Sequence, residues 1–283
     1  MYKIMVGIAH LVGWVPERFL EIICSCVGIF MFDVLRLRRA LILRNIKVAF
    51  PDLSDLEIVK IGRASSISLV TTFVETFWAW NHDVSSRVTV SNPEIMANAL
   101  AKGQGVYLVC THTGNFEAFA SFLSRRFAKV SSPVKKVGSN AGVNKFISEN
   151  RSRQGMDAFV RLKKGEGFLL IRKALQEKRI VGFMLDQARP GEPRLPLFGK
   201  PAKTNTSLGA IWERCKAPII AGYSRRVSFG RHEITFLTDE ISFTSSGDLQ
   251  ADVLNRAHFC NTIVEQLIKR CPEQYWWIHD RWK

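Results

Sequence analysis

Short apolar runs that alternate with helical patterns most constrain the fold of this 283-residue chain. Residues 105–111 (GVYLVCT) form such a run, led by a glycine, and a run of this length predicts a buried strand. Further runs of the same kind lie at 180–185, 218–223 and 233–237. Helical patterns lie at about 114–125, 166–178 and 249–271. This alternation predicts an α/β fold with a mixed central sheet flanked by helices.

A longer helix is predicted ahead of the first strand, over residues 52–80. Ser54 is a good N-cap, and Glu57 follows three residues later, which is the spacing of a capping box. This spacing therefore predicts where the helix begins.

The first 35 residues are strongly apolar. Two stretches, 4–15 and 19–35, are separated at Pro16, and carboxylates at Glu21 and Asp33 interrupt the second. A membrane-spanning helix needs about 20 apolar residues. The segment therefore fits a helix that spans the membrane or one that lies in its interface. A core helix and a cleaved signal peptide are the alternatives, and no A-x-A-like cleavage site follows.

A basic cluster comes directly after this segment. Its members are Arg36, Arg38, Arg39, Arg44 and Lys47. Positive charge beside an apolar segment favours the cytoplasmic side and anionic lipid headgroups. We therefore interpret residues 1–35 as a hydrophobic membrane anchor, with residues 36–283 forming a domain in the cytoplasm.

The charge of the chain is uneven. Forty Lys and Arg against 25 Asp and Glu give +15, and residues 125–203 alone carry 19 and 6, a net of +13. Such a surface attracts anions, including acidic lipids, an acidic carrier protein, a nucleotide-bearing cofactor or nucleic acid. No helix-turn-helix, zinc-finger or RNP-type pattern appears, so nothing specific favours nucleic acid. The apolar share of 47% excludes a disordered chain.

The sharpest chemical signal follows the first strand. His112-Thr113-Gly114-Asn115-Phe116-Glu117 spans the expected turn from strand to helix. On one continuous helix, residues five apart would lie about 140° apart, so His112 and Glu117 can meet only if the histidine precedes the helix. A carboxylate on one imidazole nitrogen would make the other a general base. A structural histidine beside a helix-start glutamate is the alternative.

Several ordered motifs then resemble one family. They are Arg44-Asn45 with Phe50-Pro51, Glu75, the His112-x-x-x-x-Glu117 motif, Asp186-Gln187, Leu197-Phe198-Gly199-Lys200-Pro201-Ala202 with Thr204, and Pro272-Glu273-Gln274-Tyr275-Trp276-Trp277-Ile278-His279 with Arg281. Together they resemble the late acyltransferases of lipid A biosynthesis, within the lysophospholipid acyltransferase-like superfamily. The resemblance extends from about residue 36 to the end of the chain. Phe116 departs from it, because many relatives have tryptophan there, and Ala188-Arg189-Pro190 is more basic than expected.

The resemblance implies transfer of a fatty acyl chain from a carrier thioester, usually acyl-carrier protein, to a hydroxyl of a lipid A precursor. No covalent acyl-enzyme, metal or cofactor is expected. His112 would be the general base and Glu117 its orienting partner, both catalytic. Arg151, with Arg153 as the near alternative, and Asp186 would contact the substrates, and we add Asn115 to this group. The implied location is the cytoplasmic face of the bacterial inner membrane.

Other functions remain open at this point. The acceptor could be a lysophospholipid, a glycolipid or an aminolipid, and the donor could be acyl-CoA. A basic module that only binds nucleic acid or anionic membranes would use the charge without the chemistry. A metal hydrolase using His112 and Glu117 would need a third ligand and lacks the H-E-x-x-H pattern.

Overall fold

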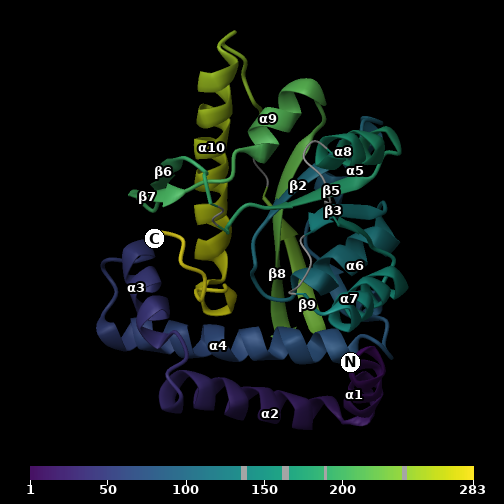
Figure 1. The fold of residues 1–283 in the computed structure, drawn as a ribbon, viewed down its shortest axis with the longest axis vertical. Helices are drawn as coiled ribbons and strands as arrows, with labels where there is room; N and C mark the ends of the chain where they lie inside the picture. The colour runs from purple at the N-terminus through teal and green to yellow at the C-terminus, as the bar shows by residue number, and fades with distance from the viewer. Residues whose placement is uncertain (135–138, 161–165, 188–189, 238–240) are drawn as a thin grey trace.

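One seven-stranded sheet organises the chain in the computed structural model, which describes residues 1–134, 139–160, 166–187, 190–237 and 241–283. The strand order is β1-β9-β8-β2-β5-β3-β4. These strands are β1 (Val88–Val90), β2 (Val106–Cys110), β3 (Val130–Val134), β4 (Asp157–Val160), β5 (Ile180–Met184), β8 (Ile219–Ser228) and β9 (Arg231–Phe236). The β8–β9 hairpin is antiparallel, and the other neighbouring pairs of this sheet are parallel (Figure 1). The mixed α/β sheet predicted from the sequence is confirmed.

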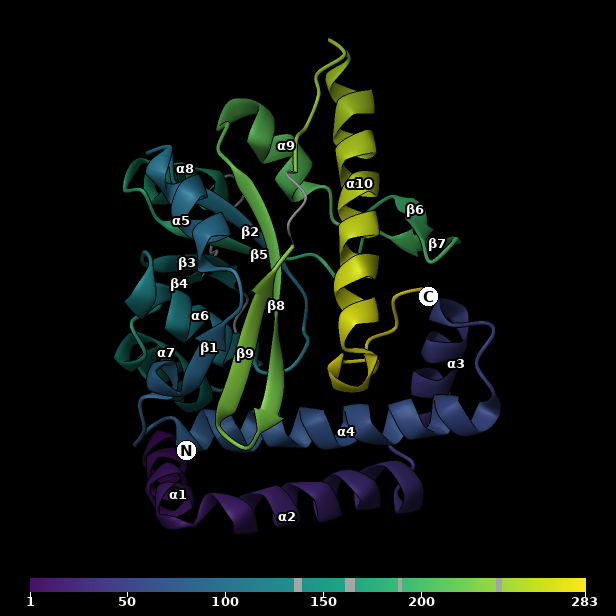
Figure 2. The same ribbon diagram turned by 180° about the vertical axis from the view of Figure 1, so that it is seen from behind.

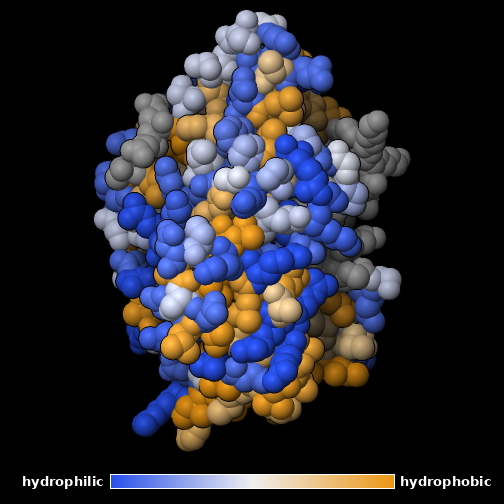
Figure 3. Space-filling model, turned by 90° about the vertical axis from the view of Figure 1, so that its left-hand side faces the viewer, coloured by the Kyte–Doolittle hydropathy of each residue, from blue (hydrophilic) through white to orange (hydrophobic). Residues whose placement is uncertain are grey.

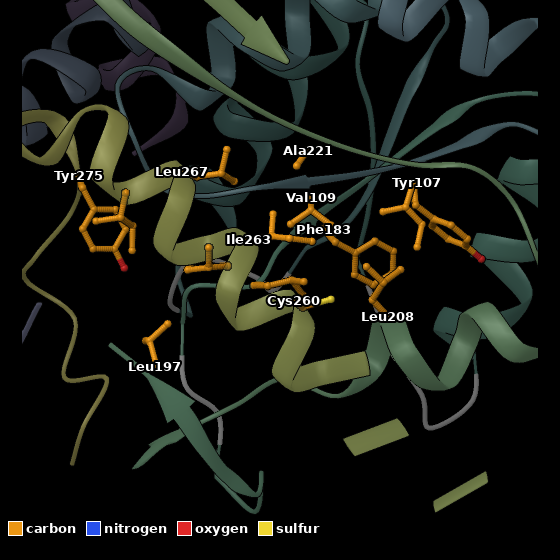
Figure 4. Close-up of a cluster of buried hydrophobic side chains, with 14 of the residues drawn as sticks. Tyr107, Val109, Phe183, Leu197, Leu208, Ala221, Cys260, Ile263, Leu267 and Tyr275 are labelled. Carbon is orange, nitrogen blue, oxygen red and sulfur yellow. The ribbon is translucent and has the colours of Figure 1, made fainter. Parts of the chain in front are cut away.

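Helices cover both faces of the sheet (Figure 2). On one face, α5 (Pro93–Ala101) and α6 (Phe116–Arg126) pack over the side chains of Leu108 and Cys110. On the other face, α8 (Glu166–Gln176), α9 (Ser207–Arg214) and α10 (Leu249–Arg270) enclose the larger core around Tyr107 and Val109 (Figure 4). Because successive residues of β2 point to opposite faces, an all-apolar strand contributes to both cores.

Helix α4 (Asp55–Trp78) crosses below the sheet, with α3 (Arg39–Ala49) at one of its ends (Figure 1). Ser54 caps α4 and forms the capping box with Glu57, as predicted. The remaining elements are the helix α7 (Ala141–Arg153), the short helices η2 (Val84–Arg87) and η3 (Pro272–Gln274), and the separate hairpin of β6 (Arg194–Leu197) with β7 (Lys200–Lys203).

The N-terminal segment differs from the expected single anchor helix. It forms α1 (Tyr2–Trp14) and α2 (Glu17–Ile29), which breaks from α1 at Pro16 and continues as a π-helical turn, η1 (Phe30–Val34). Leu20 and Cys24 of α2 are buried against α4. Within the described ranges, no helix is both long and apolar enough to cross a membrane, so the spanning form of the predicted anchor is not supported.

The apolar character of these helices nevertheless remains partly on the surface. Large apolar side chains of both helices are exposed, among them Ile4, Leu11, Trp14, Phe19 and Ile23. Figure 3 shows hydrophobic and hydrophilic side chains side by side at the lower end of the molecule, the end where Figure 1 places α2. Each helix therefore packs one side on the rest of the fold and leaves apolar side chains of its other side exposed.

Candidate active site

The ends of β2 and β5 bring two predicted site residues together. These strands are parallel neighbours, and Cys110 pairs with Met184 at their carboxyl ends. His112 and Asp186 each stand two residues farther along, so the strand register places them side by side. The carboxyl edge of such a sheet is where crevices for ligands open.

His112 and Asp186 are joined by two contacts. The His112 backbone N–H donates to Asp186 Oδ2 at 2.9 Å, and the ring Nδ1 lies 2.8 Å from Oδ1. A carboxylate at Nδ1 favours the tautomer that carries its proton there, which leaves Nε2 unprotonated and able to accept a hydrogen bond. The amide nitrogen of Gln187 lies 3.2 Å from Nε2. The imidazole is thus oriented as a general base requires.

Asp186 is almost fully buried, at 2% exposure. Burial alone would raise the pKa of this carboxyl, but His112 and the nearby Arg281 hold it below its ordinary value. The hydroxyl of Tyr275 is also hydrogen-bonded to Asp186, and burial raises the pKa of that hydroxyl. Asp186 therefore remains a carboxylate at neutral pH, able to keep Nδ1 protonated.

The expected pairing of His112 with Glu117 is not the one found. Glu117 lies in the first turn of α6 and accepts from Arg151 at the end of α7, with Nε at 2.9 Å from Oε2 and Nη2 at 2.5 Å from Oε1. Burial would lower the pKa of the Arg151 guanidinium, but Glu117 raises it. The physical reason lies in the helix start: Phe116 packs its ring on His112 at 5.0 Å, and the next residue turns toward α7.

Two other predicted substrate contacts have structural surroundings. Arg153 is half-exposed, stacks over the ring of Trp80 at 4.1 Å and pairs with Glu149. Asn115 is 2% exposed, caps α6 by accepting from the Ala118 N–H, and donates its amide to a buried carboxylate. Neither of these side chains contacts His112 in these bonds, and their role in substrate binding stays a prediction.

The turn between β2 and α6 requires a glycine. Gly114 has φ of +58°, and a Cβ at this position would lie 2.1 Å from the carbonyl oxygen of Ser224. Its N–H donates to the Gln274 carbonyl, and the Trp276 N–H donates to the His112 carbonyl. The C-terminal segment therefore clamps this turn along its length.

An aromatic wall surrounds the imidazole. The ring of Trp276 lies 5.3 Å from that of His112 and 5.2 Å from that of Phe116. The sequence indicates Trp276 only as part of the C-terminal motif. Its contact with His112 depends on a chain segment more than 160 residues away, which spacing alone does not show.

A cavity open to the surface lies beside the Glu117–Arg151 pair. It lies between α6 and the sheet, and Phe116 separates it from His112. Its charged lining residues are Glu117, Arg151 and Asp157, while the others are apolar or small. Gly182 stands in the middle of β5, where a side chain would otherwise occupy this space.

A metal site would require side chains that could serve as ligands. In the portions of the chain that are described, no three His, Cys, Asp or Glu side chains gather in a way that could hold a metal ion. The basic Ala188-Arg189 pair after Asp186-Gln187 lies outside the described residues.

Comparison with known proteins gives a consistent result. The family profile described as bacterial lipid A biosynthesis acyltransferase matches residues 1–283. The chain is 24% identical over 288 residues to a lipid A biosynthesis lauroyltransferase and to a lipid A biosynthesis palmitoleoyltransferase, both of Escherichia coli (strain K12). A lipid A biosynthesis acyltransferase of Shigella flexneri has the same identity. Each comparison covers 98% of this chain and 90% of the relative.

Proposed function

The chain belongs to the bacterial lipid A biosynthesis acyltransferase family and is an acyltransferase, and from that premise we propose its substrates and mechanism. The donor is a fatty acyl thioester of acyl-carrier protein, and the acceptor is a hydroxyl of a lipid A precursor. The observation that carries this proposal is the His112–Asp186 pair at the carboxyl edge of the sheet, with Phe116 between it and an apolar cavity.

The reaction proceeds by direct attack, without an acyl-enzyme. Nε2 of His112 takes the proton of the acceptor hydroxyl as its oxygen attacks the thioester carbonyl, and Asp186 stabilises the imidazolium that forms. The tetrahedral intermediate then collapses, the C–S bond breaks, and His112 returns the proton to the leaving sulfur. The products are the ester and the free thiol, so atoms and charges balance.

The Glu117–Arg151 pair has a separate task in this scheme. Its contacts use Nε and Nη2 of the guanidinium. We assign the remaining N–H groups to the thioester oxygen as its negative charge develops, an effect commonly worth about 3 kcal/mol per donor. Glu117 then acts by holding Arg151 in place, and no longer as the partner of His112.

The apolar cavity is the proposed site of the acyl chain. Its lining includes Glu117 and Arg151, and most of its apolar wall comes from β2, β3, β5 and α6. A chain lying there would place its carbonyl carbon near the ion pair and next to Phe116, which contacts the imidazole. The cavity thus supplies a reason for the fatty acyl group, beyond the names of the relatives.

The acceptor would reach the enzyme from a membrane. We propose that α1 and α2 embed their exposed apolar sides in the interface, while the basic residues that follow meet anionic headgroups at the cytoplasmic face of the inner membrane. The anchor would then be a pair of apolar helices packed on the catalytic domain.

Membrane docking is tested by sedimentation with anionic and neutral vesicles. Phe19→Ser with Ile23→Ser should reduce the bound fraction, because both side chains are exposed on α2. Leu249→Ser is the matched control, since Leu249 is equally exposed but begins α10 at the other end of the molecule (Figure 1). Equal binding by the three proteins would contradict interfacial docking.

The activity is tested with purified protein and radiolabelled thioesters. Acyl-carrier protein and coenzyme A thioesters are each offered with an underacylated lipid A precursor, a lysophospholipid, a glycolipid and an aminolipid. Transfer from the carrier protein to the lipid A precursor is the expected result. Transfer only to another acceptor, or only from acyl-CoA, would keep the chemistry and replace the substrate. Absence of transfer in every combination would overturn the proposal.

A further inference from the structure

The carboxylate of Glu75 is buried beneath the turn between β2 and α6. Glu75, in the last turn of α4, is fully buried and accepts four hydrogen bonds. Arg226 of β8 donates two, from Nε at 2.9 Å and Nη2 at 2.8 Å. The backbone N–H of Gly230 and the amide of Asn115 donate the others, at 2.9 and 2.8 Å. One side chain thus joins α4, β8, the turn before β9 and the start of α6.

Stability alone does not account for this arrangement. Burial would raise the pKa of the Glu75 carboxyl, but Arg226 and His232 hold it below its ordinary value, so the ion pair persists. A buried ion pair carries a large desolvation cost, and well-packed apolar side chains often stabilise a fold as well. The value of the pair therefore lies in the geometry that it fixes.

The first arm of this network fixes the start of α6. Asn115 donates to Glu75 and accepts from the Ala118 N–H at 2.9 Å, so both ends of its amide are committed. This orientation sets the direction in which α6 leaves the turn. The residues on either side are the ones that the proposed mechanism uses, with His112 before the cap and Glu117 after it.

The second arm reaches the turn itself through Arg226. Its Nη2 donates to the Thr72 hydroxyl at 2.7 Å, and that oxygen lies 2.9 Å from the Gly114 carbonyl. The backbone of Arg226 exchanges two hydrogen bonds with the Gln274 side chain, at 2.7 and 2.9 Å. The Gln274 carbonyl in turn accepts from the Gly114 N–H. The carbonyl and the N–H of Gly114 are therefore both linked to Arg226, each through one intervening residue.

We propose that Glu75 and Arg226 are positioning residues for acyl transfer: they hold the turn that carries His112, and the first turn of α6, in the reactive arrangement. This inference rests on the proposed function but concerns residues that touch no substrate. A displacement of about 1 Å at reacting groups can cost about 10²-fold in rate. Loss of the network should therefore lower kcat by a larger factor than it raises KM, because the turn carries His112 while the cavity walls from β2, β3 and β5 are not altered.

The test exchanges the acid and the amide of Glu75 and Asn115, whose side chains are hydrogen-bonded to each other. Glu75→Gln should lower kcat by about 10²-fold. Asn115→Asp keeps a good N-cap but sets a second carboxylate against Glu75, so its kcat should fall at least as far. In the double variant, the amide introduced by Glu75→Gln can donate to the carboxylate introduced by Asn115→Asp, and kcat should rise above that of Asn115→Asp alone. A double variant no more active than Asn115→Asp would overturn the proposal.

Two further proteins separate positioning from general destabilisation. Asp252→Asn alters another buried acid, which pairs with Ser246 and Arg256 at the start of α10, far from the turn. It should lower the melting temperature without a comparable loss of kcat, and an equal loss would contradict a positioning role. If Glu75→Gln does not fold, Asn115→Ser takes its place, because serine keeps the cap and removes the amide donor.

Hydrogen exchange of residues 111–118 gives a readout independent of catalysis. Glu75→Gln and Asn115→Ser should speed exchange there relative to Asp252→Asn, because the turn opens more easily. Unchanged exchange would contradict the positioning role even if the enzyme is active. If the wild-type protein transfers no acyl group, the proposed function fails, and the exchange result still decides whether the network holds the turn.

Discussion

Asp186 binds His112 at two points, through the backbone N–H at 2.9 Å and through Nδ1 at 2.8 Å. Replacement with Asn leaves a group of similar shape without the charge that stabilises the imidazolium. We expect Asp186→Asn to reduce kcat by about 10²- to 10⁴-fold. The measurement is steady-state acyl transfer, with the melting temperature taken alongside. A kcat close to that of the wild type would show that Asp186 is not the orienting partner.

The two arginines at the end of α7 should differ sharply. Arg151→Lys loses the two-pronged contact with Glu117, so we expect kcat/KM to fall by about tenfold or more. Arg153→Lys is the matched control, because Arg153 is half-exposed and contacts Trp80 and Glu149. Its kcat/KM should stay near the wild-type value. Equal losses in the two variants would remove the special role of Arg151.

The floor of the cavity should set the acyl chain length. A Cβ at Gly182 would meet only the Ser132 side chain at 3.8 Å, so a small side chain fits the fold and fills the cavity. Gly182→Val should shift the ratio of kcat/KM values toward shorter thioesters by about tenfold. Gly182→Ala should give a smaller shift in the same direction. Uniform loss for all chain lengths would indicate that the acyl chain binds elsewhere.

Stability should fall in mild acid because of His232. Burial lowers its pKa from 6.5 to about 4, with Arg226 acting in the same direction and Glu75 opposing. The folded protein keeps this ring neutral, so the unfolded chain binds more protons between those two values. The contribution of neutral His232 to the free energy of unfolding is fully present above pH 6.5. It is lost as the pH falls toward 4, a loss of about 3 kcal/mol.

Denaturant unfolding at several pH values measures this effect. His279 also has a pKa lowered by burial and adds to the slope, so the informative quantity is the difference between the wild type and His232→Gln. The wild type should lose more unfolding free energy than the variant between pH 6.5 and about 4. Parallel curves would mean that His232 does not titrate as its burial requires.

The sequence predicts the local parts of this fold well. The strands at 105–111 and 180–185 and the capping box at Ser54 depend on neighbours in the chain, and the structure confirms them. Strand β3 is not predicted, because Val130–Val134 includes two serines and a proline, residues that weaken a strand pattern. The long apolar segment suggests one anchor, since hydropathy does not show that Leu20 and Cys24 pack on α4.

The candidate site shows the same limit. Spacing indicates Glu117 as the partner of His112, but the partner of the imidazole depends on which strand lies beside β2. That neighbour is β5, whose residues pair with positions 74 earlier in the chain, and only its register selects Asp186. The pairing of Glu75 with Arg226 is not predicted from the sequence for the same reason, since the two residues are 151 apart in the chain. Pairing across a sheet is a tertiary property, which a local pattern does not encode.

The central claim is that His112 is the general base of a direct acyl transfer. The most direct measurement compares wild type and His112→Ala with a radiolabelled acyl-carrier-protein thioester and an underacylated lipid A precursor. We predict transfer by the wild type and a loss of about 10²- to 10⁴-fold in the variant, with both proteins folded. Transfer by His112→Ala at the wild-type rate would contradict it.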